Sequence, residues 1–160
     1  MALGIRDAVD LVIGDSLKTL KSEGFPLHTF ALYFDHESSA LAVCADSREN
    51  SKVQVASQNE YSFKYFRKCI KNANTEEAQL WQANIGRNLS LGDFSRVNLG
   101  RVELPEFTFT NEACIAMVER LLSWQDQIAS LAPGPDELIF CCSTPSDEVG
   151  LVFSHERGAV

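Results

Sequence analysis

The first segment of the chain has the period of an amphipathic α-helix. Apolar residues recur at three- and four-residue intervals from position 5 to position 20, with charged residues between them. Gly24 and Pro26 follow, and both residue types favour the end of a helix. The pattern therefore predicts one helix that ends at Gly24 and buries a single stripe made of Ile5, Ala8, Val9, Val12, Ile13, Leu17 and Leu20.

The next segment changes to a two-residue period. Apolar side chains alternate over residues 30–34 and again over residues 41–45, and the residues between these runs are mostly polar. Two alternating runs around a short polar turn predict a β-hairpin. Residues 46–52 are polar and are expected to form a loop, after which Val53 and Val55 either add a short strand or lead into a helix.

The middle of the chain returns to helical spacing in two places. Residues 61–70 form the first helical pattern, and Asn74 or Thr75 is expected to cap a second helix, because two acidic residues follow in its first turn. The second helix is expected to end at about Gly86 or Asn88. The positions that define these patterns are Tyr61, Tyr65, Phe66, Cys69 and Ile70 in the first, and Ala78, Trp81, Ile85 and Leu89 in the second.

The C-terminal part contains a further helix between strands. A short strand is expected over residues 101–104, and two strands over 137–142 and 149–154 are expected to form a second hairpin. Thr110 or Asn111 is expected to cap the longest helix, which ends before Pro133. The expected buried face of that helix is Cys114, Met117, Val118, Leu121, Leu122, Ile128 and Leu131.

This order of elements predicts an α+β fold with an antiparallel sheet of about four to six strands covered by helices. The 160 residues have 45% hydrophobic and 22% charged residues, which is typical of a globular protein, and we expect residues 1–160 to form a single domain. No run approaches the ~20 apolar residues that cross a bilayer. We therefore expect a cytoplasmic protein without membrane contact.

The charge is negative and unevenly distributed. The formal net charge is −8, which disfavours binding to nucleic acid or to anionic membranes. Residues 102–156 hold ten acidic residues against Arg120 alone. The basic residues include a small group at Lys64, Arg67, Lys68 and Lys71, which we interpret as the solvated face of one helix rather than as a nucleic-acid site.

The residues that could carry chemistry form no recognisable motif. Five cysteines at irregular spacing in apolar context indicate buried free thiols, and neighbouring Cys141 and Cys142 are expected to face opposite sides of a strand. The triplet at residues 35–37 holds three metal-ligand types, but in a hairpin turn we expect it to be solvated. No cofactor or metal site is predicted. A hydrolase or transferase that uses Cys44 or His28 is the enzymatic alternative.

Three segments carry a resemblance to a family. They are Phe30-Ala31-Leu32-Tyr33-Phe34, Asn74-Thr75-Glu76-Glu77 and the loop at residues 91–100, which has Phe94 where tryptophan is expected. In these segments the chain resembles a family of small acidic bacterial domains often found among the immunity proteins encoded beside polymorphic toxins. The resemblance implies a protein without catalytic residues that binds and neutralises a cognate toxin.

The expected function is therefore stoichiometric binding of a protein partner by an immunity or inhibitor-like protein, with a basic toxin domain as the candidate partner. An accessory or adaptor protein is a further alternative. Acidic side chains in loops and at strand ends can reach a partner and speed its association. The candidate partner-binding residues are Glu103, Glu106, Asp136, Glu137, Asp147 and Glu148.

Overall fold

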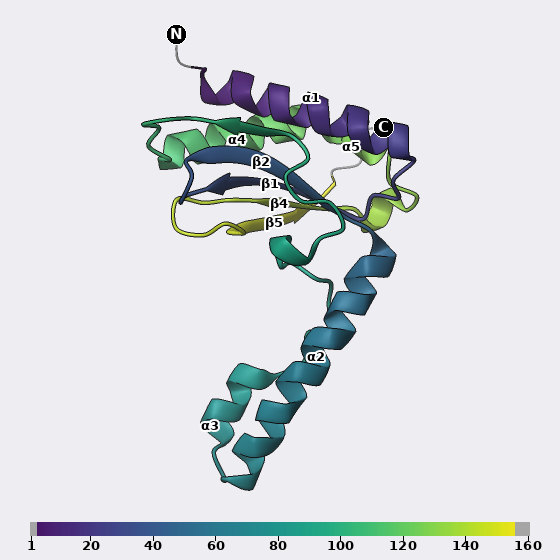
Figure 1. Cartoon of the computed structure of the whole chain (residues 1–160), viewed down its shortest axis with the longest axis vertical. Helices are drawn as coiled ribbons and strands as arrows, with labels where there is room; N and C mark the ends of the chain where they lie inside the picture. The colour runs from purple at the N-terminus through teal and green to yellow at the C-terminus, as the bar shows by residue number, and fades with distance from the viewer. Residues whose placement is uncertain (1–2, 156–160) are drawn as a thin grey trace.

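The computed structural model describes residues 3–155 as an α+β domain built around one five-stranded sheet (Figure 1). The strands lie in the order β3-β2-β1-β4-β5. Their bounds are Thr29–Asp35 for β1, Ala40–Asp46 for β2, Arg101–Glu103 for β3, Ile139–Cys142 for β4 and Leu151–Ser154 for β5. The predicted fold class is confirmed.

The sheet is mixed rather than wholly antiparallel. β1 pairs antiparallel with β2 from Thr29↔Asp46 to Asp35↔Ala40, but it pairs parallel with β4 from Thr29↔Ile139 to Leu32↔Cys142. The remaining pairs, β2 with β3 and β4 with β5, are antiparallel. The antiparallel expectation was correct for both hairpins and wrong for the contact between them, because a helical crossover brings the chain back to β4 in the direction of β1.

Three helices cover one face of the sheet: α1 (Ile5–Glu23), α4 (Asn111–Ser123) and α5 (Gln125–Ala129). The main core lies between them and the sheet, and it includes the predicted stripe of α1 together with Phe30, Leu32 and Phe140. Leu122 was predicted to be buried but is exposed on α4. The long helix predicted here is interrupted at Trp124, where the backbone turns before α5 begins.

The opposite face of the sheet is covered by the chain itself rather than by a long helix. Residues 89–94, with the short 3-10 helix η2 (Leu91–Asp93), place Leu91 and Phe94 on Tyr33, Cys44 and Cys141. Cys142 belongs to the helix-side core, so the two neighbouring cysteines face opposite sides of β4 as predicted. Both faces of the sheet are therefore occupied.

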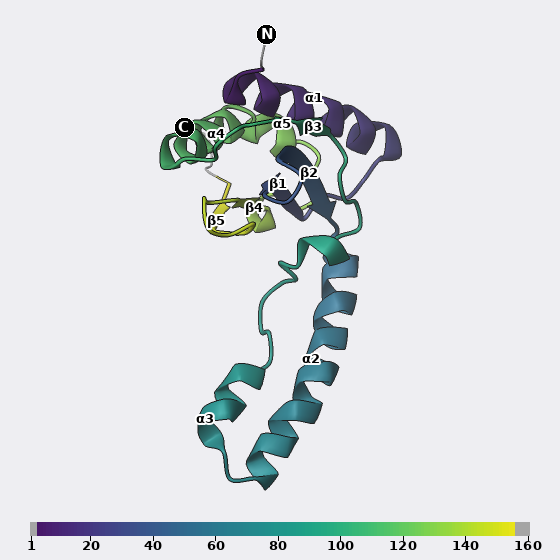
Figure 2. The ribbon, with the colours of Figure 1, turned by 60° about the vertical axis from the view of Figure 1, so that its left-hand side comes forward.

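One part of the molecule leaves this body. α2 (Arg48–Lys71) starts where β2 ends and extends away from the sheet, and α3 (Thr75–Ala78) with the 3-10 helix η1 (Gln79–Trp81) folds back along it (Figure 2). Residues 82–88 then return to the body. We call residues 48–88 the arm and the rest of the described chain the body.

The arm differs from the sequence prediction at both ends. The expected loop at residues 46–52 was wrong because the Ser47 hydroxyl accepts a hydrogen bond from the Asn50 amide at 3.1 Å and caps α2, so that Val53 lies inside the helix. The expected second helix stops at Trp81. In the return segment Asn84 and Asn88 accept from the amides two residues ahead, Gly86 and Ser90, which favours turns over a helix.

Candidate functional site

The arm exposes large apolar side chains that the body would bury. Ile85 is fully exposed, Leu80 is 77% exposed and Phe63 is 59% exposed. Tyr61 and Ile70 are also at least half exposed, whereas the only buried residues of α2 are Ser51 and Cys69. Exposed apolar side chains gathered on one element mark an interaction surface more often than scattered ones do.

A small aromatic cluster joins the two sides of the arm. The Trp81 ring stacks on Tyr65 with centroids 4.5 Å apart and planes at 22°, and the Tyr61 ring lies 5.0 Å from Tyr65. Farther along, Ala78 of α3 and Cys69 of α2 are buried. These contacts hold α3 and η1 against α2 and leave the flank of the arm that carries Phe63 and Phe66 uncovered.

That flank contains two adjoining depressions. One has a volume of about 600 Å³ and is lined by Phe63, Phe66, Trp81 and Ile85 among others. The next, of about 230 Å³, lies toward the tip of the arm and is lined by Phe66, Ile70 and the first residues of α3. Both are therefore mainly apolar.

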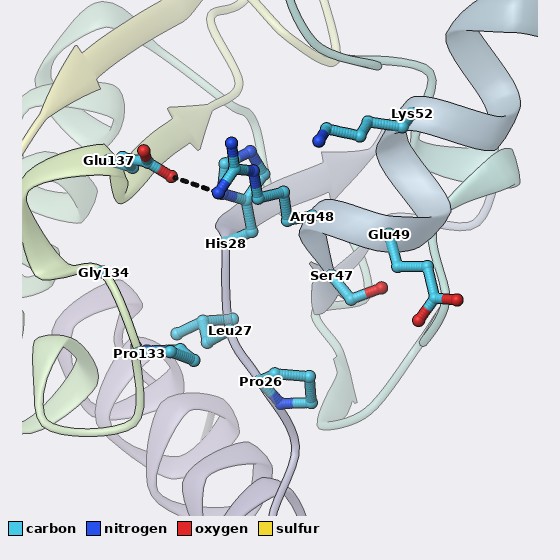
Figure 3. A pocket seen from close by; sticks show the side chains of 10 residues that line it. All are labelled: Pro26, Leu27, His28, Ser47, Arg48, Glu49, Lys52, Pro133, Gly134 and Glu137. Atoms are coloured by element: carbon cyan, nitrogen blue, oxygen red, sulfur yellow. Dashed lines mark ion pairs between the residues drawn. The ribbon is translucent and has the colours of Figure 1, made fainter.

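The root of the arm carries a different cleft, of about 630 Å³, between the start of α2 and the body (Figure 3). Arg48 and Lys52 extend into it from the first turns of α2, and His28 lines it from the segment before β1. Glu137 lies on the opposite side and pairs with Arg48 at 3.8 Å. The cleft thus combines two cationic side chains of the arm, Arg48 and Lys52, with two carboxylates, Glu49 of the arm and Glu137 of the body.

Arg87 fixes the returning end of the arm to the body. Its guanidinium donates to the backbone oxygens of His28 at 2.7 Å and of Glu137 at 2.6 Å, and to the Thr29 hydroxyl at 3.0 Å. Burial and the nearby Arg87 charge lower the pKa of His28 below its ordinary value, so its imidazole is neutral at pH 7. The exposed positive charge of the root cleft therefore comes from Arg48 and Lys52.

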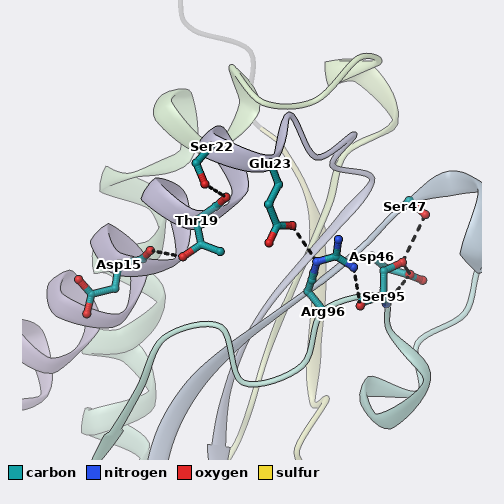
Figure 4. A network of polar contacts seen from close by, with 8 residues as sticks. All are labelled: Asp15, Thr19, Ser22, Glu23, Asp46, Ser47, Ser95 and Arg96. Carbon is teal, nitrogen blue, oxygen red and sulfur yellow. Dashed lines mark hydrogen bonds and ion pairs between the residues drawn. The ribbon is translucent and has the colours of Figure 1, made fainter.

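The outgoing end of the arm is fixed by a buried carboxylate (Figure 4). Asp46 Oδ1 accepts from the Ser95 amide at 3.1 Å, from the Ser95 hydroxyl at 2.9 Å and from Asn50 Nδ2 at 2.8 Å. The neighbouring Arg96 pairs with Glu23 at the end of α1 at 2.8 Å. These contacts tie the first turn of α2 to the loop on the body, so the arm has a defined direction.

The two ends of the arm also contact each other. The Asn88 amide donates to the Ser51 hydroxyl at 2.9 Å, and Gln58 donates to the Asn88 side chain at 2.8 Å. Farther out, Asn59 accepts from the Asn84 amide at 2.8 Å and donates to the Asn84 carbonyl oxygen at 3.1 Å. Amide side chains, rather than apolar ones, thus hold the return segment on α2.

All six predicted partner-binding residues are exposed, but they do not form one surface. Glu103 pairs with Ala40 at the hairpin end of the sheet, and Glu106 follows it on the same side. Asp147 and Glu148 lie in the loop between β4 and β5, which the strand register places at that same end. Asp136 and Glu137 lie at the opposite end, before β4 and beside the root of the arm. Glu156, the last of the ten acidic residues in the segment 102–156, lies outside the described residues.

The groups considered for catalysis have structural surroundings. All five cysteines are free and buried. Burial raises the pKa of Cys44 to about 11 and that of Cys141 to about 12, so both remain thiols at neutral pH. In the 35–37 triplet, Asp35 accepts from the amides of Glu37 and Ser38 and pairs with Arg101 at 3.2 Å. Within residues 3–155 no group of three or more His, Cys, Asp or Glu side chains is arranged to hold a metal ion.

Sequence reasoning missed the arm as a surface. Its aromatic residues have helical spacing, which is equally typical of a helix buried in a core, so exposure could not be inferred from the pattern. The charge distribution was the available signal. Residues 48–88 hold seven basic and four acidic residues, a formal charge of +3, whereas the rest of the chain holds seven basic and eighteen acidic residues, a charge of −11.

Among the helices in residues 3–155, none combines the length and the hydropathy that a membrane span requires. Comparison with protein-family models, with curated proteins and with solved structures gives no match to this chain.

Proposed function

We propose that this chain acts by stoichiometric binding of a protein partner, in the manner of an immunity or inhibitor protein, and that the arm makes the contact. The observation that carries the proposal is the exposure of Phe63, Leu80 and Ile85 on an element that extends from the body. A partner that covers these side chains would gain about 25 cal/mol of binding free energy for each Å² of apolar surface removed from water.

The composition of the arm supports this proposal. Aromatic residues dominate the binding energy of protein interfaces, and the arm carries the cluster of Tyr61, Tyr65 and Trp81 together with the exposed Phe63. Its root is fixed by Asp46 and Arg87, so little conformational freedom is lost at the root when a partner binds.

The immunity function follows from the resemblance of the hairpin, the α3 start and the 91–100 loop to immunity-type domains. A basic toxin domain would be attracted by the charge of the body, where Glu103, Glu106, Asp147 and Glu148 are exposed at one end of the sheet. We propose these four acids as a steering surface and the arm as the main contact. Asp136 and Glu137 are separated from that surface.

The test is affinity capture from the native cells with three forms of the tagged chain. The arm variant carries Phe63→Ser and Ile85→Ser. The matched control carries Leu11→Ser and Ile115→Ser, which remove two apolar side chains of the body that are about half exposed. We expect the wild-type chain and the control to retain a partner at 1:1 stoichiometry, and the arm variant to bind it at least tenfold more weakly.

Equal retention by all three forms would contradict a binding role for the arm. The immunity role has its own readout. Expression of the isolated partner in a bacterial host should arrest growth, and co-expression of this chain should restore it. A captured partner that has no effect on growth would favour the adaptor alternative over the immunity one.

A further inference from the structure

The four depressions along the arm adjoin one another through shared lining residues, and we call them together the groove. The root cleft shares His28, Arg48 and Lys52 with the next depression outward, which has a volume of about 560 Å³. That depression shares Asn59 and Ile85 with the apolar depression around Phe63. The latter shares Phe66 and Gln82 with the one at the tip. The groove therefore runs from the body to the end of α2 along one flank.

The chemistry of the groove changes along its length. At the root it contains Arg48 and Lys52 beside the carboxylates of Glu49 and Glu137, and Lys52 takes part in none of the ion pairs among the described residues. The pair of Arg48 with Glu137 is 3.8 Å long, and both side chains are more than half exposed, so it is readily exchanged for another carboxylate. Toward the tip the lining becomes Phe63, Phe66 and other apolar or amide side chains.

A second row of cations follows the apolar part of the groove. Arg67 lies one helical turn after Phe63, and Lys71 one turn after Arg67, so they occupy neighbouring positions on the surface of α2. Both side chains are exposed. An occupant of the groove therefore meets cations at the root and along one rim, and apolar side chains between them.

We infer that the occupant of this groove is an acidic amphipathic polypeptide segment of the partner, with carboxylates at the root and an apolar face on Phe63, Phe66 and Ile85. This inference rests on the proposed function and names the kind of segment that the arm recognises. Amphipathic helices bind apolar grooves in this manner, through anchors at positions i, i+3 or i+4, and i+7.

A polypeptide suits the groove better than a nucleic-acid strand. A strand carries a phosphate at every nucleotide, whereas the cations beside the outer groove, Arg67 and Lys71, lie on one rim, and its lining contains no cationic side chain among the described residues. Bases also bind by stacking on open aromatic faces, but the Trp81 ring already stacks on Tyr65, and the Phe63 ring lies nearly parallel to Phe66 with centroids 6.5 Å apart. Aliphatic Ile70 and Ile85 offer contacts to apolar side chains instead.

The test measures fluorescence anisotropy with a labelled synthetic peptide of about 20 residues, close to the length of α2. The peptide has glutamates in its first half and leucines at helical spacing in its second half. The comparison probes are the same peptide with lysine for glutamate, the same peptide with serine for leucine, and single-stranded oligothymidine. We expect the acidic peptide to bind at least tenfold more tightly than each of the three.

Two variants then locate the peptide. Arg48→Ala with Lys52→Glu should weaken binding at least tenfold at low salt and less at high salt, and Phe63→Ser with Ile85→Ser should weaken it at every salt concentration. The body control, Leu11→Ser with Ile115→Ser, should bind like the wild type. The inference is overturned if the lysine peptide or the oligonucleotide binds more tightly, or if neither arm variant changes the affinity.

Self-association is measured in the same samples by light scattering. A dimer that dissociates in the Phe63→Ser, Ile85→Ser variant would make a second copy the occupant and overturn the inference. The captured native partner separates the two proposals. Loss of that partner in the apolar variant alone, with the Arg48→Ala, Lys52→Glu variant unaffected, would refute the acidic segment and leave the binding role of the arm standing.

Discussion

The body and the arm are built on opposite principles. The body encloses its large apolar residues between helices and sheet, with Phe30 and Phe140 fully buried, and carries its charge as a net excess of acids. The arm buries almost nothing, leaves Phe63 and Ile85 in solvent and has an excess of basic residues. Apolar side chains thus stabilise the fold in one region and are available to a partner in the other.

The sharpest test of this difference compares two phenylalanines. Phe140→Ala should destabilise the protein by about 3–5 kcal/mol, because it removes a buried ring that packs against Phe30 and Phe153. Phe63→Ala should change the free energy of unfolding by less than about 0.5 kcal/mol, since its ring is mostly exposed. Urea unfolding measures both. Similar losses in the two variants would mean that the arm has a core of its own.

Two glycines of the body, Gly100 and Gly92, differ in how much space surrounds them. A Cβ on Gly100 would collide with the carbonyl oxygen of Val12 and lie 2.9 Å from the Ser16 hydroxyl, so Gly100→Ala must push α1 away from the sheet. We expect a loss of about 1–3 kcal/mol, the usual cost of overpacking. Gly92→Ala is the matched control, because nothing lies within 4 Å of its Cβ position. Thermal unfolding of both variants decides whether this close approach limits the body.

The ion pair between α1 and α4 gives the body a pH dependence. Burial raises the pKa of Asp10, but hydrogen bonds from Trp124 and Arg120 and the charge of Arg120 lower it further, so the net pKa lies below its ordinary value. The stabilisation is therefore present above about pH 4 and is lost as the pH falls through the folded-state pKa.

Asp10→Asn should remove this stabilisation. We expect a loss of about 1–2 kcal/mol at pH 7, at the low end for charged hydrogen bonds because the pair is one third exposed. The difference from the wild type should shrink at the acidic end of a pH series of urea unfolding curves. A pH-independent difference would show that packing, rather than charge, joins the two helices.

The smallest expected effect lies in the arm. Asn59→Ala removes both hydrogen bonds to Asn84 and should loosen residues 82–88 without changing the global free energy of unfolding by more than about 0.5 kcal/mol. Hydrogen exchange should therefore accelerate at the Asn84 amide and its neighbours, and not in β1 or β2. Faster exchange across the sheet would show that the arm and the body unfold together.

The sequence predicted the parts whose pattern is local. The α1 stripe, both hairpins and the opposite orientation of Cys141 and Cys142 follow from the three- to four-residue and two-residue periods and were confirmed. The parallel pairing of β1 with β4 was not predictable in this way, because it depends on how a distant helix returns the chain to the sheet.

The arm could not be predicted for a related reason. Whether the aromatic residues of a helix are buried depends on what packs against them, and the sequence of α2 does not encode that. The start of α2 could have been predicted, because Ser47 followed by Glu49 is a helix-start signal. The six acidic residues were correctly expected to be exposed, but their division between two ends of the sheet depends on the strand order.

The contact of Ser51 with Asn88 brings the two ends of the arm together at one edge of the body. Segments whose ends lie close together can be lengthened, shortened or exchanged with little effect on the elements that flank them. Most changes between Val53 and Gly86 would therefore leave the strand register and the core intact. Such an arrangement allows related proteins to diverge in what they recognise while they retain a common scaffold, and selection on recognition would act on the arm largely independently of selection on folding.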